Sequence, residues 1–164
     1  MPAVHRPILA TLGYVVSPER DRVLMVHRNK RPTDLHYGHY NGLGGKLESD
    51  EDVVSGIRRE IYEEAGLVAD TVTLRGTISW PGFGRAGEDW FGFIFRIDEW
   101  RGEAYPGNDE GTLHWVKIAD LESLPMWDSD HLFLPMVFDD DPRSFHGWMP
   151  FHAGRMVDWS YVRA

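Results

Sequence analysis

Three glutamates, Glu60, Glu63 and Glu64, are separated by three and four positions in a stretch with helical periodicity. At this spacing, their side chains project from one limited arc of a helix. Like charges placed in this way destabilise an exposed helix by about 0.2–0.5 kcal/mol per pair. A bound divalent cation would reverse that effect, and Mg²⁺ in particular binds a few carboxylates together with substrate phosphates. The spacing therefore indicates either a solvated acidic face or a metal site for phosphoryl chemistry.

The residues around this helix favour the metal site. The chain reads Gly45-Lys-Leu-Glu-Ser-Asp-Glu51 and, after seven further residues, Arg59-Glu-Ile-Tyr-Glu-Glu-Ala-Gly-Leu67. The pair Gly44-Gly45 permits a tight loop whose backbone can approach a ligand or a metal. Glu51 opens the helix, and Arg59 can orient a neighbouring carboxylate by a forked, charge-assisted hydrogen bond. Loop and helix would then form one rigid site.

This stretch resembles the Nudix box at every specified position: Gly, five residues, Glu, seven residues, Arg-Glu-apolar-x-Glu-Glu-x-Gly-apolar. The resemblance implies a Nudix hydrolase of the α/β class, folded as an α/β/α sandwich with a mixed β-sheet. We expect one such domain over residues 1–164. So specific a pattern reduces the weight of the solvated-face interpretation.

The same resemblance implies the roles of the box residues. Glu60, Glu63, Glu64 and the carbonyl of Gly44 would hold Mg²⁺, with Mn²⁺ as a substitute, to neutralise phosphate charge and activate a water molecule. The catalytic set would be Glu60, Glu63, Glu64 and Arg59. Glu60 and Glu64 are the leading candidates for the general base, with Glu110 as an off-helix contributor, and the sequence does not choose between them.

The similarity extends beyond the box to the branch that hydrolyses oxidised purine nucleoside triphosphates, the animal homologues of MutT. It is carried by four stretches: Asn41–Lys46, Met126–Pro135, Phe145–Trp148 and Met156–Trp159. By this resemblance, Asn41, Trp127 and Asp130 would bind the base. Glu110 has the position of the branch's additional acidic residue, which would be a further metal ligand.

These residue types suit a purine. Trp127 can stack on the base, which is worth about 1–3 kcal/mol in nucleic-acid complexes, while Asn41 and Asp130 can hydrogen-bond to its edge. Ser129 stands where the branch has the first of two adjacent aspartates, and Asp128 where it has proline, so the base preference stays open. Trp127 could instead be a core residue, and Lys46 could either touch phosphate or simply be exposed.

We therefore predict Mg²⁺-dependent hydrolysis of a nucleoside triphosphate, with 8-oxo-dGTP as a candidate, to the monophosphate and pyrophosphate. Such an 8-oxo-dGTP diphosphatase would serve nucleotide pool sanitation. One alternative is a Nudix pyrophosphatase for ADP-ribose, a dinucleoside polyphosphate or capped RNA. Another is a nucleotide-binding module without catalysis, against which the complete glutamate set argues.

The helix that positions the glutamates is the clearest element of the sequence. Apolar residues recur at three- and four-residue spacing from Asp50 to Ala65, which predicts one buried helical face. The acidic run Asp50–Asp52 would lie in its first turn, where it complements the helix dipole, and Gly66 would end it.

Alternating apolar residues between turn-forming stretches predict a β-sheet. The expected strands are Ile8–Val16, Val23–His27, Thr71–Trp80, Trp90–Ile97 and Leu113–Ile118. The first two would form a hairpin across Ser17–Arg22, and Asn29–Gly45 would be a long loop near a ligand. Leu132–Phe138 could be helical, and Phe145–Val162 is compatible with a closing hairpin.

Composition limits the function classes. The net charge of −9 over 164 residues argues against binding to duplex nucleic acid but permits a small nucleotide as partner. No run approaches the roughly 18 apolar residues of a membrane span. The absence of cysteine excludes a disulfide framework and a cysteine nucleophile and fits a reducing compartment, so we expect a cytoplasmic protein. Its oligomeric state, monomer or homodimer, stays open.

The eight histidines include no HExxH pairing. We therefore interpret them as loop and surface residues rather than as zinc ligands or general bases. His39, near the glycine loop, is the one that could bear on the site.

Overall fold

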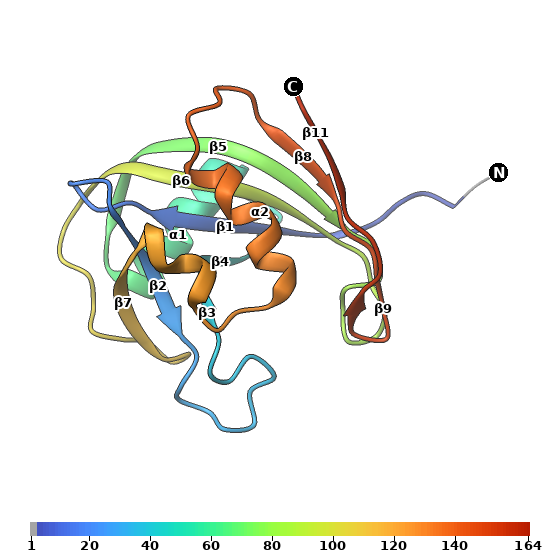
Figure 1. Cartoon of the computed structure of the whole chain (residues 1–164), viewed down its shortest axis with the longest axis horizontal. Helices are drawn as coiled ribbons and strands as arrows, with labels where there is room; N and C mark the ends of the chain where they lie inside the picture. Colours follow the sequence, from blue (N-terminus) through green and yellow to red (C-terminus); the bar gives the residue numbers. More distant parts are fainter. Residues whose placement is uncertain (1–2) are drawn as a thin grey trace.

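A computed structural model describes residues 3–164, which form a mixed six-stranded sheet with one helix on each face (Figure 1). The strand order is β11-β8-β5-β6-β1-β4, with β1–β6 and β5–β8 parallel and the other pairs antiparallel. The predicted α/β sandwich with a mixed sheet is confirmed. The elements are β1 (Ile8–Val15), β2 (Arg22–His27), β3 (Tyr40–Asn41), β4 (Leu43–Lys46), α1 (Val53–Ala65), β5 (Val68–Trp80), β6 (Trp90–Arg101), β7 (Thr112–Lys117), the 3₁₀ helix η1 (Ile118–Ser123), α2 (Asp128–Phe138), β8 (Phe145–Trp148), β9 (Phe151–His152), β10 (Arg155–Met156) and β11 (Ser160–Arg163).

The two faces of the sheet carry two separate apolar cores. Side chains alternate between faces along a strand, so Ile94 of β6 packs toward α2 while its neighbour Phe95 packs toward α1. Helix α1 contributes Ile57, Ile61 and Ala65, which are fully buried, as the apolar spacing predicts. In Figure 1, α1 lies behind the sheet and α2 in front of it. The glutamates of α1 and the residues near α2 therefore start on opposite faces.

Helix α1 begins at Val53, three residues later than predicted. Asp52 is extended, and its carboxylate accepts the N–H groups of Val54 and Ser55 at 2.9 and 2.8 Å. It caps the helix from outside because these N–H groups have no partner within the helix. The expectation that Asp50–Asp52 lie in the first turn is thus wrong. The predicted end at Gly66 is confirmed, with a left-handed φ of 73°.

The predicted hairpin of β1 and β2 is wrong. The turn is present, with the Ser17 N–H donating to the Arg22 carbonyl at 2.9 Å, but only the Val16–Val23 bridge follows it. Strand β2 pairs instead with β3 and β7 in a separate three-stranded sheet. Both edges of β1 are occupied by β4 and β6, so the turn marks a crossing between two sheets.

Other boundaries differ because strands continue where distant partners remain available. The expected loop Asn29–Gly45 contains β3 and most of β4, which pairs along the edge of β1. Strands β5 and β6 each extend beyond prediction because they pair with one another as far as Val68 and Arg101. Helix α2 starts at Asp128 instead of Leu132. The closing hairpin is confirmed as β8 with β11, with β9 and β10 forming a smaller pair between them.

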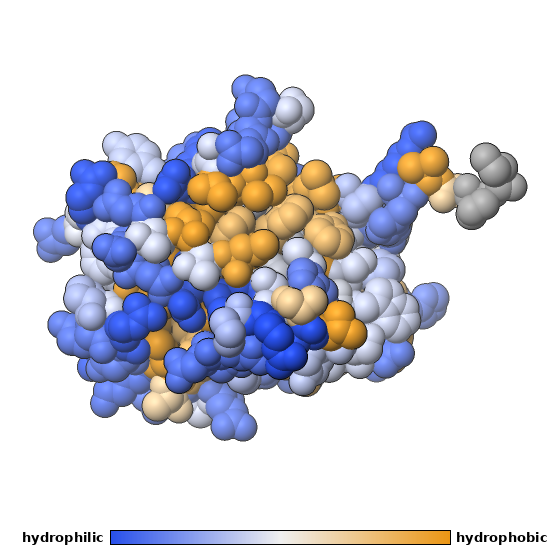
Figure 2. All heavy atoms as spheres, turned by 90° about the horizontal axis from the view of Figure 1, so that it is seen from above, coloured by the Kyte–Doolittle hydropathy of each residue, from blue (hydrophilic) through white to orange (hydrophobic). Residues whose placement is uncertain are grey.

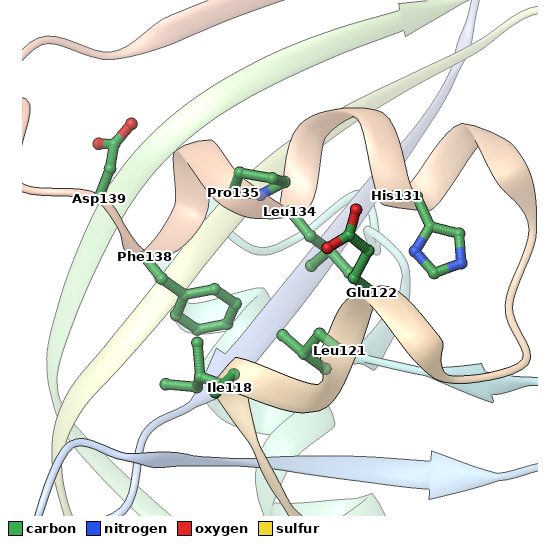
Figure 3. A pocket seen from close by; sticks show the side chains of 9 residues that line it. Ile118, Leu121, Glu122, His131, Leu134, Pro135, Phe138 and Asp139 are labelled. Atoms are coloured by element: carbon green, nitrogen blue, oxygen red, sulfur yellow. The ribbon is translucent and has the colours of Figure 1, made fainter.

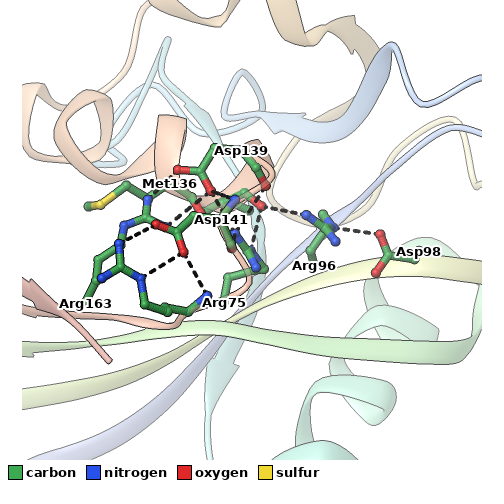
Figure 4. Close-up of polar contacts among 9 residues, drawn as sticks. Arg75, Arg96, Asp98, Met136, Asp139, Asp141 and Arg163 are labelled. Atoms are coloured by element: carbon green, nitrogen blue, oxygen red, sulfur yellow. Dashed lines mark hydrogen bonds and ion pairs between the residues drawn. The ribbon is translucent and has the colours of Figure 1, made fainter.

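Arginines anchor the end of α2 to the sheet (Figure 4). Buried Arg75 of β5 donates to the carbonyls of Met136, Val137, Asp139 and Asp141, and pairs with the Asp139 carboxylate at 3.0 Å. Arg163 of β11 also pairs with Asp139. These bonds satisfy carbonyl groups that the helix end leaves without partners. Helix α2, and with it the residues at its start, is thereby fixed over one face of the sheet.

The surface over the last strands is partly apolar. Seen from above, apolar residues gather in the middle of the molecule between hydrophilic borders (Figure 2). Exposed large hydrophobic side chains on the strands β5, β8 and β11 include Leu74, Trp148, Tyr161 and Val162. No helix within residues 3–164 is both long and apolar enough to cross a membrane.

Candidate active site

A cavity of about 230 Å³ lies between the β1–β4–β6 edge of the sheet, the start of α2 and the loop after β2. It brings together five of the residues proposed from the sequence. They come from β3, β4, the loop before β7 and the start of α2, and are Asn41, Gly44, Glu110, Trp127 and Asp130. Base-binding and metal-binding candidates therefore line one continuous cavity.

Two glycines let the edge strand β4 approach its neighbours. Gly44 has a φ of 150°, and a Cβ there would lie 2.0 Å from the Thr11 carbonyl oxygen. A Cβ on Gly45 would lie 2.6 Å from Glu60 Oε1 of helix α1. Distances below 3.0 Å are not seen for real Cβ atoms, so a side chain at Gly44 would clash with backbone, whereas one at Gly45 would displace the Glu60 carboxylate. The glycine pair thus places bare backbone directly against the carboxylates of α1.

Arg59 connects the segment before α1 with the carboxylates on it. Its Nε and Nη2 donate to the two oxygens of Glu51 at 2.8 and 2.6 Å. Its Nη1 donates to Glu60 at 3.1 Å and to Glu63 at 3.3 Å. The fork lowers the pKa of Glu51 to about 2 and raises the pKa of Arg59. Arg59 therefore orients the neighbouring carboxylate Glu51 and restrains Glu60 beside Gly45.

Glu64 is the most strongly perturbed carboxyl of the cluster. It accepts the Gly44 N–H at 3.4 Å and lies near Glu60 and Glu110. Burial, followed by the hydrogen bond with Glu60 and the charge of Glu110, raises the pKa of Glu64 to about 9. Without a cation, the Glu60–Glu64 pair therefore retains a proton at neutral pH.

Glu63 lies apart from this pair. Its side chain is 56% exposed and reaches Arg59, whereas that of Glu60 is only 13% exposed. Within residues 3–164, no three acidic or histidine side chains already meet as a complete metal cage. Glu64 thus lies near both Glu60 and Glu110, whereas Glu63 lies at the solvent side.

The close acidic groups fit a hard divalent cation. Glu60 and Glu64 are adjacent, and burial and like charges raise the pKa of Glu64, an effect that a bound cation would reverse. Mg²⁺ uses one or two protein carboxylates and completes its shell with waters and phosphate oxygens, so a partial set is the expected form of such a site. The donors are all oxygens, as this class of ion requires.

Asp130 and Trp127 form the opposite wall of the cavity. Both lie at the start of α2, with Trp127 preceding the helix and Asp130 in its first turn. Burial raises the pKa of Asp130 to about 7. Ser129 also lines the cavity, whereas Asp128 is exposed. Of the two positions where the branch has aspartates, only Asp130 therefore places a carboxyl in this cavity.

Two further lining residues, Arg28 and His36, were not identified from the sequence. Arg28 pairs with Asp34 at 2.8 Å and reaches Glu110 at 3.4 Å. His36 accepts the Trp127 indole N–H at 2.7 Å and is half-buried, although histidines were expected at the surface. No local pattern marks either residue as part of the cavity, because Glu110 and Trp127, the cavity residues that they contact, are 82 and 91 positions away.

His39, singled out from the sequence, packs edge-on against Trp127 with ring centroids 4.6 Å apart. Lys46 lies outside the cavity that holds Asn41. It lines an adjoining hollow of about 410 Å³, with its Nζ 5.5 Å from the centroid of the Trp90 ring. Lys46, which could contact phosphate, thus shares this hollow with Trp127 but lies apart from Asn41 and Asp130.

A larger cavity of about 430 Å³ lies between η1 and α2 (Figure 3). Its walls are mainly apolar, with Glu122, His131 and Asp139 as the ionisable groups. None of the residues proposed from the sequence lines it. The smaller cavity beside Gly44 is therefore the better candidate for chemistry.

Comparisons with known proteins show which proteins this chain resembles. The family model described as NUDIX domain matches residues 7–137. The chain is 33% identical to the oxidized purine nucleoside triphosphate hydrolase of Danio rerio, over 91% of this chain and 90% of the relative, and 30% identical to that of Mus musculus, over 79% and 78%. The crystal structure of a mutator MutT protein from Bacillus halodurans superposes with a TM-score of 0.80 at 26% identity, covering 94% of this chain and 97% of that one.

Proposed function

Because this chain belongs to the Nudix family of hydrolases, we propose that it hydrolyses a purine nucleoside triphosphate to the monophosphate and pyrophosphate. An oxidised purine such as 8-oxo-dGTP is the first substrate to test, since two relatives carry the name oxidized purine nucleoside triphosphate hydrolase. One observation carries the proposal: Trp127 and Asp130 line the same cavity as Gly44 and Glu110. A nucleotide whose base lies beside Trp127 would direct its phosphates toward the acidic cluster.

The cluster would hold the divalent cations through Glu60, Glu64, Glu110 and the Gly44 carbonyl, with Glu63 contributing from the solvent side. The family generally uses such ions, and we assign Mg²⁺, with Mn²⁺ as a substitute. When bound, the cations would neutralise phosphate charge and make water a better nucleophile.

The protein side chains have separate tasks. Arg59 would hold Glu60 and Glu51 in place through its three-way hydrogen bonding. We assign the general base to Glu64, because Glu60 is held by the Arg59 guanidinium whereas Glu64 lies against the Gly44 N–H and the carboxyl of Glu60. With cations bound, Glu64 would give up the proton that it holds in their absence, and its carboxylate could then accept a proton from water. Glu64 would take this proton while water attacks the phosphorus in line with the leaving group.

The base would lie against Trp127, with Asn41 and Asp130 at its edge. Stacking supplies affinity that depends little on base identity. A carboxyl that titrates near pH 7 can accept from a ring N–H when ionised and donate to a ring nitrogen when protonated. Asp130 would therefore set base preference. Because its carboxyl can either accept or donate a hydrogen bond, it would bind more than one form of a purine.

A substrate panel tests the proposal. The purified chain is assayed with 8-oxo-dGTP, dGTP, dATP, ADP-ribose, a dinucleoside tetraphosphate and capped RNA, with Mg²⁺ or Mn²⁺, and products are separated by chromatography. We expect kcat/KM to be highest for a purine triphosphate, with monophosphate and pyrophosphate as products. Higher kcat/KM for ADP-ribose or another diphosphate would overturn the substrate assignment, and no turnover of any compound would favour a binding module.

A further inference from the structure

His36 and Trp127 form a specific pair across the mouth of the cavity. They are 91 positions apart in sequence, yet the Trp127 indole Nε1 donates to His36 Nδ1 at 2.7 Å. The two rings meet edge to face, with an interplanar angle of 90° and centroids 5.6 Å apart. A hydrogen bond in this direction, combined with perpendicular rings, restricts rotation of the indole about its side-chain bonds.

The loop that carries His36 is itself held against the acidic cluster. Arg28 pairs with Asp34, and Asp34 Oδ1 accepts the backbone N–H of His36 at 3.1 Å. Arg28 also reaches Glu110, which lies beside Glu64. His36 is therefore fixed in place by its own backbone and by an ion pair.

We infer that His36 is a positioning residue for base recognition: its imidazole fixes the plane of the Trp127 indole and thereby the gap into which a purine base fits. This rests on the proposed function for the role of Trp127 in stacking. Stacking requires a ring held parallel to the base. An indole that is free to rotate would lose conformational entropy when the base binds, which would weaken affinity. His36 touches no reacting atom in this arrangement, so its removal should weaken binding more than turnover.

The alternative is that His36 merely fills space beside the tryptophan. Two substitutions separate these roles. His36→Phe retains an aromatic ring for the edge contact but has no acceptor, whereas His36→Asn lacks the ring but can place an amide oxygen near the position of Nδ1. His5→Phe, at an exposed histidine on the N-terminal segment, is the matched control.

The first readout needs no activity. The indole N–H resonance of Trp127 is assigned in ¹⁵N-labelled protein by its disappearance in Trp127→Phe. We expect a downfield resonance in the wild type, His36→Asn and His5→Phe, and an upfield shift in His36→Phe. Acidification should move the wild-type resonance, because a protonated imidazole cannot accept this bond.

The charged and titratable groups around His36 include Arg28, Asp34, His39 and Arg85, and burial together with Arg28 lowers its pKa. In His36→Phe, any remaining pH dependence of the Trp127 signal would come from other groups near the indole, including Asp130, whose pKa burial raises to about 7. An indole resonance that is identical in wild type and His36→Phe would overturn the inference.

The second readout is the split between kcat and KM. For the purine triphosphate that the substrate panel identifies, His36→Phe should raise KM by about 3–10-fold, the effect of one hydrogen bond, with a smaller change in kcat. His36→Asn should recover most of this loss. A KM increase in His36→Asn that equals or exceeds the one in His36→Phe would show that the acceptor is not what matters and would overturn the positioning role.

Titration of the Trp127 resonance with dGMP and 8-oxo-dGMP keeps the inference separable from the proposed reaction. Binding that perturbs this resonance, and that weakens in His36→Phe, supports the inference even if no triphosphate is hydrolysed. Absence of any perturbation by either monophosphate would overturn the role in base recognition.

Discussion

Glu51 and Arg59 are joined by two short hydrogen bonds, 2.8 and 2.6 Å long, although Glu51 precedes helix α1 and Arg59 lies within it. Arg59 is also bonded to Glu60, which packs against Gly45. One guanidinium thus determines how the glycine strand, the start of the helix and the first carboxylate lie relative to each other.

Removing this fork should impair both stability and catalysis. Arg59→Lys retains the charge but cannot donate to both Glu51 oxygens, and we expect kcat/KM to fall by at least about tenfold because the carboxylates lose their orientation.

The pKa of Glu51 is lowered by folding, so its contribution to stability is present above its unfolded pKa and is lost as pH falls through about 2. Urea unfolding of Glu51→Gln should accordingly show lower stability than wild type at pH 7, and the two curves should converge toward pH 2. A constant difference across this range would contradict the assignment.

The three helix glutamates should not contribute equally. Glu64 is close to Gly44 and Glu60, whereas Glu63 is largely exposed. We expect Glu64→Gln to reduce kcat by on the order of 10³-fold or more, combining loss of a cation ligand and of the base. Glu63→Gln should have a smaller effect and should raise the Mg²⁺ concentration needed for half-maximal rate. Wild-type rates in Glu64→Gln would refute the metal assignment.

The proton held by Glu64 predicts how stability varies with pH. Its pKa is raised by folding to about 9, so its contribution to stability is complete below its unfolded pKa, near 4.3, and is lost as pH rises through about 9. In EDTA, Glu64→Gln should therefore become more stable relative to wild type as pH increases from 5 to 10. Thermal unfolding measures this, and added Mg²⁺ should raise the Tm of wild type but not of the variant. A Tm difference independent of pH would count against a retained proton.

Asp130 should control which base is accepted. Its pKa of about 7, set by burial, predicts that KM for triphosphates changes between pH 6 and 8 as the carboxyl ionises. Asp130→Asn should remove this pH dependence. It should also change the kcat/KM ratio of 8-oxo-dGTP to dGTP by about tenfold or more, because a base whose hydrogen-bonding groups do not match those of the pocket binds more weakly. The pH profiles of both proteins with both substrates provide the measurement. An unchanged ratio and profile would place base selection elsewhere.

Alanine substitutions at the adjacent glycines should have different effects. A methyl at Gly44 would meet the Thr11 backbone at 2.0 Å, which cannot move without disturbing β1, so Gly44→Ala should lower the Tm strongly. A methyl at Gly45 would meet the side chain of Glu60, which can rotate away. Gly45→Ala should thus fold but lose at least about tenfold in kcat, because Glu60 leaves its position. Equal Tm losses in both variants would contradict this distinction.

Local spacing alone determined helix α1 and the acidic cluster. The apolar stripe at Ile57, Ile61 and Ala65 is buried as predicted, and Gly66 ends the helix, because these features depend on neighbours within one or two turns. The family pattern likewise gave the α/β sandwich and the position of Gly44 against Glu64. In each case the interacting residues lie within about 20 positions or follow a fixed spacing.

Tertiary structure alone decided which strand edges were filled and which distant side chains met. The Ser17–Arg22 turn was predicted, but only the occupation of both edges of β1 sends β2 into another sheet. The bond from Trp127 to His36, and the separation of Glu63 from Glu64 by exposure, have no sequence signature either. Such contacts depend on how whole elements pack against one another. The spacing of apolar residues specifies which face of a single helix or strand is buried, but not which distant side chain that element will meet.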